Sequence, residues 1–81
     1  MARFTVLLQA ETDGGYSVTV PALEGCQTQG DSVEDALAMA VDAIEGNLAV
    51  RLERGIDVPV ENPPIIVASV DVSLPAVALI G

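Results

Sequence analysis

Residues 14–48 read GGYSVTVPALEGCQTQGDSVEDALAMAVDAIEGNL, and this stretch decides the fold. The paired glycines at its start can adopt the positive φ angles of a tight hairpin. Residues 16–20 are rich in the β-branched and aromatic side chains of a strand, and Pro21, which has no amide proton, ends that strand. Residues 22–25 are typical of a turn, so we expect a short further strand at residues 26–29.

The residues before the hairpin show the alternation of a half-buried strand. Between residues 3 and 11, one face carries Phe4, Val6, Leu8 and Ala10, and the other carries Thr5, Leu7 and Gln9. A strand here pairs antiparallel with residues 16–20 through the hairpin. The sequence therefore predicts a three-stranded antiparallel meander.

A helix is predicted after the meander. Ser32 can cap its first turn, Asp35 completes a capping box, and Gly55 ends the helix. Apolar residues recur at spacings of three and four, the pattern of a helix face that packs on a sheet. They are Val33, Leu37, Ala40, Val41, Ile44 and Leu48. We expect the helix to cover one face of the sheet through this stripe.

Residues 65–72 have the β-branched content of a final strand and follow a proline-rich connection. A strand–helix–strand crossover tends to be right-handed and parallel. We therefore expect a fourth strand parallel to the first, at the edge of a sheet ordered three, two, one, four. The predicted fold class is α+β, with the element order β-β-β-α-β.

That edge strand would be apolar on both sides, which is an aggregation hazard unless it is covered. Hydrophobic residues make up 51% of the chain and its mean hydropathy is +0.51, more apolar surface than a core of 81 residues can hide. We expect a second copy to cover it, in a homodimer or homotetramer. The predicted interface residues are Ile65, Ile66, Val67, Val70 and Val72.

The charge balance restricts the class of partner. Lys and Arg total 3, Asp and Glu total 12, and the formal net charge is −9. This field repels nucleic-acid phosphates and anionic lipids, so we expect no direct nucleic-acid or membrane partner. The same field attracts a basic protein. The alternative is that the charge only keeps an apolar oligomer soluble.

The sequence contains neither histidine nor lysine, which removes the usual general base and the commonest metal ligand. Cys26 has no imidazole to activate its thiol, so it is interpreted as a small strand residue. Carboxylates alone could hold magnesium in a nuclease. Such a site needs acids inside the central strand, where this chain has Val6, Leu7 and Leu8. We expect no catalysis, no metal, no cofactor and no small-molecule substrate.

With 81 residues, the chain has room for one domain, residues 1–81. Its single cysteine cannot form an intramolecular disulfide, and its first residues lack the apolar core of a signal peptide. No apolar stretch reaches the roughly 18 residues of a membrane span. We expect a cytoplasmic protein.

Taken as a whole, residues 14–48 resemble the amino-terminal domain of HicB-type antitoxins. The resemblance rests on Gly-Tyr, a short strand, Pro-Ala-Leu-Glu-Gly-Cys, a small polar strand, Gly-Asp-Ser and the helix start, and it covers about residues 3–60. It implies a partial ribonuclease H-like fold without nuclease activity, and dimers or tetramers. It also implies a partner of the HicA type, a small basic RNA-cleaving toxin whose active site the antitoxin covers.

Many members of that family carry a helix-turn-helix or ribbon-helix-helix domain after this module. This chain stops at Gly81, so we expect no carboxy-terminal DNA-binding domain. A basic toxin needs countercharge, and the candidate partner-binding residues are Tyr16, Glu24, Asp31, Glu34 and Asp35. The alternative function is an orphan self-assembling module, structural or regulatory, that binds protein without a toxin partner.

Overall fold

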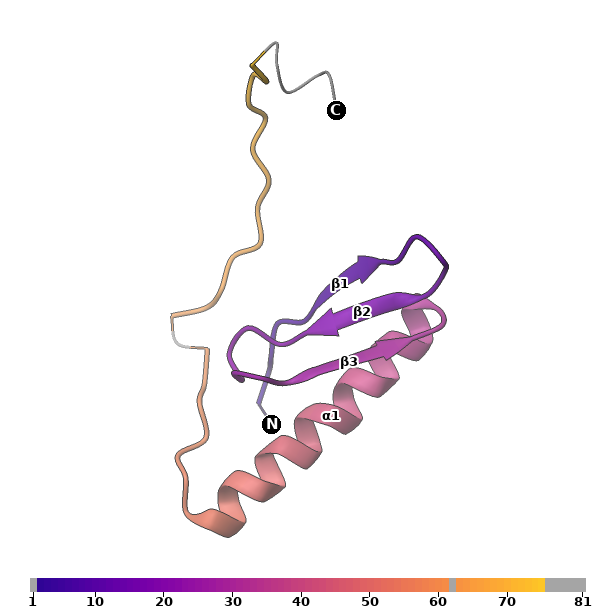
Figure 1. The fold of residues 1–81 in the computed structure, drawn as a ribbon. Coiled ribbons are helices and arrows are strands. Elements are labelled where there is room, and N and C mark those ends of the chain that lie inside the picture. Colours follow the sequence, from indigo (N-terminus) through magenta and orange to yellow (C-terminus); the bar gives the residue numbers. More distant parts are fainter. Residues whose placement is uncertain (1, 62, 76–81) are drawn as a thin grey trace.

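A computed structural model describes residues 2–61 and 63–75 (Figure 1). Three short strands precede one long helix: β1 (Leu7–Ala10), β2 (Tyr16–Thr19), β3 (Gln27–Gly30) and α1 (Val33–Arg54). The predicted meander and helix are therefore confirmed, and the fold class is α+β. Within the described residues, no helix is long and apolar enough to cross a membrane.

The sheet has the order β1-β2-β3, and both strand pairs are antiparallel. The first hairpin turns through Gly14 (φ 100°) and Gly15 (φ 82°), as their sequence position predicts. The Glu11 amide closes the turn by donating to the Gly15 carbonyl at 3.0 Å. After β2, the Val20 amide donates to the Cys26 carbonyl at 3.2 Å and leads the chain into β3.

The core consists of two small apolar clusters between the sheet and α1. In the first, Val18 of β2 packs with Ala36 and Ala40 of the helix. In the second, the turn after β2 provides Val20, Leu23 and the free thiol of Cys26. Partly buried side chains from the first strand region, the start of β2 and the helix complete them: Phe4, Val6, Leu8, Tyr16, Ala43, Ile44 and Leu48.

The buried face of α1 agrees with the predicted stripe at Ala40, Ile44 and Leu48 and differs from it nearer the start of the helix. Ala36 and Ala40 are its buried residues, whereas Val33, Leu37 and Val41 are 47%, 44% and 57% exposed. The reason is a close approach at the end of β3, where a β-carbon added to Gly30 would lie 2.5 Å from Ala36 Cα. Only a small side chain fits such a contact, so the alanines face the sheet and the larger residues turn to its flank.

The helix ends as the sequence predicts, and the chain then returns to the sheet. Gly55 adopts a left-handed conformation, with φ 69°, and Ile56 N–H donates to the Arg51 carbonyl at 2.8 Å. Further on, the carboxylate of Glu61 accepts from both polar groups of Thr5: the amide at 2.8 Å and the hydroxyl at 3.0 Å. This two-point contact holds residue 61 beside the segment that leads into β1.

The predicted fourth strand is not found. Residues 63–75, here called the apolar segment, form no strand, are exposed, and extend away from the sheet and helix (Figure 1). The radius of gyration is accordingly 16.3 Å, against about 12 Å for a compact chain of this length. Pro63 and Pro64 favour an extended, stiff backbone, which keeps the direction of the departing chain.

Candidate partner-binding groove

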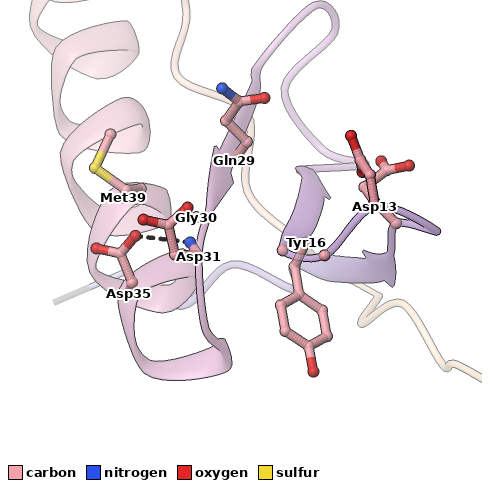
Figure 2. A pocket seen from close by; sticks show the side chains of 10 residues that line it. Asp13, Tyr16, Gln29, Gly30, Asp31, Asp35 and Met39 are labelled. Carbon is pink, nitrogen blue, oxygen red and sulfur yellow. Dashed lines mark hydrogen bonds between the residues drawn. The ribbon is translucent and has the colours of Figure 1, made fainter.

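An acidic groove of about 560 Å³ lies where the β1–β2 turn, the end of β3 and the start of α1 meet (Figure 2). It is open to solvent, and its lining is mostly polar. The lining residues are Glu11, Asp13, Gly14, Gly15, Tyr16, Gln29, Gly30, Asp31, Asp35 and Met39.

The helix cap fixes the acidic residues on one side of the groove. Ser32 has an extended backbone, and its Oγ accepts from the Asp35 amide at 3.0 Å. Asp35 Oδ2 in turn accepts from the Asp31 amide at 2.9 Å, the bond drawn in Figure 2. The Asp35 amide is thus satisfied as one of the free donors of the first turn. The Asp35 carboxylate accepts from the amide one residue before the cap, and not from the Ser32 amide that a capping box would use. The same bonds hold Asp31 and Asp35 in place.

The first hairpin supplies the other side of the groove. Tyr16 is the partner of Ala10 on one side and of Gly30 on the other, so the turn lies next to the end of β3. A β-carbon at Gly15 would lie 3.1 Å from the Gly30 carbonyl oxygen, which shows how closely the two loops approach. The half-buried Tyr16 also packs against the first core cluster, which anchors the aromatic residue of the groove.

Negative charge is concentrated here without local compensation. Glu11, Asp13, Asp31 and Asp35 line the groove, and none of the three arginines of the chain does. At the other end of α1, Arg51 donates to Asn47 Oδ1 at 2.8 Å and to the Asp57 carbonyl at 3.3 Å. The helix therefore carries acidic side chains in its first turn and basic ones in its last, the distribution that its dipole favours.

The carboxylates of the groove are spread around its rim. In residues 2–61 and 63–75 there is no group of three or more His, Cys, Asp or Glu side chains that could hold a metal ion. Spread carboxylates can instead accept hydrogen bonds from several separate cationic side chains. The geometry suits lysine and arginine residues distributed over the surface of a protein.

The groove brings together three of the five predicted partner-binding residues: Tyr16, Asp31 and Asp35. Glu34 is exposed in the first turn of α1 but is not part of the lining, and Glu24 lies in the turn after β2, at the opposite end of the sheet. Four further lining residues were not predicted from the sequence: Glu11, Asp13, Gln29 and Met39. The predicted meander could have placed Glu11 and Asp13 near Asp31, because the first turn of a meander and the end of its third strand lie at the same end of the sheet.

Comparisons with known proteins agree on one family. Residues 4–77 match the family described as HicB_like antitoxin of bacterial toxin-antitoxin system. A protein of Photorhabdus laumondii named Antitoxin HicB 1 is 36% identical over 61 residues, 75% of this chain and 39% of that protein.

Two further relatives carry only a family label. UPF0150 protein Ta0767 of Thermoplasma acidophilum is 35% identical over 60 residues, 74% of this chain and 87% of that protein. UPF0150 protein ssr1765 of Synechocystis sp. is 49% identical over 43 residues, 53% of this chain and 54% of that protein. The chain thus spans about half of the Synechocystis relative and less than half of the Photorhabdus protein.

Proposed function

The chain belongs to the HicB-like antitoxins of bacterial toxin–antitoxin systems, and from that premise we propose that it binds and neutralises a small basic RNA-cleaving toxin of the HicA type. In this proposal the acidic groove is the contact surface, and the protein acts in the cytoplasm as a binding module that catalyses no reaction. Membership of an antitoxin family suggests a toxin as the partner. The acidic surface of this chain favours a toxin that is basic.

The observation that carries the proposal is the set of four groove carboxylates with no arginine beside them. Because no arginine lines the groove, a cationic side chain from a partner gains a charge-assisted hydrogen bond there without breaking an ion pair within the groove. A net charge of −9 adds long-range attraction that speeds the encounter with a basic protein. Tyr16 offers an amphipathic ring of the kind enriched at protein interfaces.

A second candidate function is an orphan self-assembling module that binds protein without a toxin. The specific observation in its favour is the exposure of the predicted interface residues. Ile66 and Val70 are each 84% exposed, and the others follow: Val72 74%, Val67 65% and Ile65 39%. Surface of this kind marks an interaction site. Self-association and toxin binding use different surfaces, so the two functions are separable by mutation.

The test of the groove co-expresses the chain with the product of an adjacent reading frame that encodes a small basic protein. We expect the two to copurify and the chain to relieve growth arrest by that protein. The double variant Asp13→Asn/Asp31→Asn removes two groove charges and is expected to weaken the complex by about 10-fold in titration calorimetry.

The matched control is Asp42→Asn/Asp57→Asn, which removes the same charge from exposed positions outside the groove. It is expected to bind within about 2-fold of the wild type. Equal weakening by both double variants would show that only net charge matters and would reject the groove. A neighbour that neither copurifies nor is neutralised would count against the antitoxin function itself.

A further inference from the structure

The outer edge of β1 is open. The Glu11 amide donates to the Gly15 carbonyl, so residues 11 and 15 are a hydrogen-bonded pair of the β1–β2 ladder. Hydrogen-bonded pairs alternate along an antiparallel ladder, so the next ones are Gln9 with Ser17 and Leu7 with Thr19. The amides and carbonyls of Leu8 and Ala10 therefore point away from β2. In the described residues no further strand pairs with this edge.

An apolar groove runs along the same edge, between the segment that leads into β1 and the flank of α1. Its volume is about 480 Å³. It is lined by Ala2, Phe4, Val6, Leu37, Ala40, Val41, Ile44, Glu45 and Leu48. The groove exists because α1 packs its alanines against the sheet and leaves Leu37 and Val41 at the side, 44% and 57% exposed. A strand added at β1 would place alternate side chains over this groove.

The apolar segment has the side-chain pattern of such a strand. One face carries only apolar residues, namely Ile66, Ala68, Val70, Val72 and Leu74. The other face begins with the apolar Ile65 and Val67 and becomes polar from Ser69 onward, with Asp71 and Ser73, so the two faces differ in its second half. On the apolar face the large side chains are 61% to 84% exposed, with Leu74 the lowest and Ile66 and Val70 the highest. Period-two alternation of this kind is typical of a strand that covers a core with one face only.

Charge permits this contact between two copies. The chain carries −9 overall, so most surfaces of two copies repel each other. Between residues 62 and 81 the only charged side chain is Asp71, on the polar face, and the groove contains only Glu45. The segment and the groove are thus the pair of surfaces that two acidic copies can join at the lowest electrostatic cost.

The path of the chain indicates a second copy as the source of the segment. Glu61 is held on Thr5, which lies between the groove residues Phe4 and Val6, and Pro63 and Pro64 then direct the chain away from the body. We propose that residues 65–74 of one copy add as a strand to the β1 edge of a second copy and place their apolar face in its groove. Such an exchange of one element between copies is a low-cost route to a dimer.

The first test compares two neighbouring positions on opposite faces of the segment. Val70→Asp puts a charge into the docked face, whereas Ser69→Asp puts the same charge on the face that stays in solvent. In sedimentation equilibrium we expect the wild type and Ser69→Asp to be dimers. We expect Val70→Asp to raise the dimer dissociation constant by roughly 100-fold, because the buried carboxylate has no partner. Equal masses for the two variants, or a monomeric wild type, would overturn the proposal.

The second test identifies the acceptor and the source of the segment. Val41→Asp charges the groove, and Ala49→Asp charges an exposed helix position outside it; only the first is expected to be monomeric, with unchanged helical circular dichroism. The Val70→Asp variant keeps an intact groove, and the Val41→Asp variant keeps an intact apolar segment. A mixture of the two can dock one intact segment in one intact groove and is expected to form dimers again. A mixture that stays monomeric would show docking within one chain and would overturn the exchange, while toxin binding through the acidic groove is measured independently.

Discussion

Gly30 is the residue at which the sheet and the helix come closest. A β-carbon there would lie 2.5 Å from Ala36 Cα and 2.9 Å from the carbonyl carbon of Asp35, both backbone atoms of the helix start. Backbone atoms cannot move aside as the end of a flexible side chain can. The missing side chain at this position therefore sets the distance between β3 and α1.

Gly30→Ala is expected to destabilise the protein by about 1–3 kcal/mol, because the added methyl group forces the helix off the sheet. Urea unfolding followed by circular dichroism measures the change. Gly46→Ala is the matched control, since Gly46 is exposed in the middle of α1 and an added β-carbon there meets nothing within 4 Å. It should stabilise the helix by about 1 kcal/mol. A neutral Gly30→Ala would contradict the close approach.

At the scale of the elements, α1 depends on its two ends. Ser32 satisfies the Asp35 donor of the first turn, and Gly55 lets the chain leave the last turn in a left-handed conformation. The cap also belongs to the acidic groove, because the bond from the Asp31 amide orients Asp35. Stability of the helix start and geometry of the groove are consequently coupled.

Ser32→Ala removes the acceptor of the Asp35 amide and is expected to cost about 1 kcal/mol of folding free energy. The midpoint of urea unfolding should fall, with an unchanged slope. Ser69→Ala, in the exposed apolar segment, is the control and should leave the midpoint where it is. If both variants unfold at the same urea concentration, the cap does not stabilise the helix.

Local signals explain which elements could be predicted from the sequence. The hairpin, the helix start and the helix end depend on residues that act on their own backbone: Gly14, Gly15, Ser32 and Gly55. The predicted helix face is right at Ala40, Ile44 and Leu48. It is wrong at the start of the helix, because burial there depends on a contact with Gly30, which lies in another element. The spacing of apolar residues shows which residues share a face of the helix. It does not show how closely the sheet packs against that face.

The same distinction applies to the sites. Asp31 and Asp35 were selected as acids near the helix start that could supply countercharge, whereas Glu11 and Asp13 reach the groove only through the pairing of Tyr16 with Gly30. For residues 65–72 the strand pattern is present but no pairing partner lies beside them in the described chain. A strand forms only when it pairs with another strand. The β-branched content of a segment does not show which strand that is.

At the scale of the whole molecule, salt should act with opposite sign on the two surfaces. Raising salt from about 0.1 M to about 1 M shortens the Debye length from about 10 Å to about 3 Å. Binding of the basic partner should weaken because its attraction to the acidic groove is screened. Self-association should strengthen, because the repulsion between two copies of charge −9 is screened while apolar contact is not.

Titration calorimetry with the partner and sedimentation equilibrium of the chain alone, each at both salt concentrations, measure the two trends. The Val70→Asp variant serves as the reference for sedimentation, since its mass should respond little to salt. Parallel trends in the two measurements would mean that one surface serves both contacts.

The contact between Thr5 and Glu61 has a consequence for the size of any assembly. It holds the exit of each donated strand next to the acceptor edge of the same chain. Two copies related by a twofold axis near that edge can each donate a strand and accept one at the same time, so that neither β1 edge stays unpaired. Such a ring of two is closed, whereas a distant exit point would let each copy recruit the next and grow a filament.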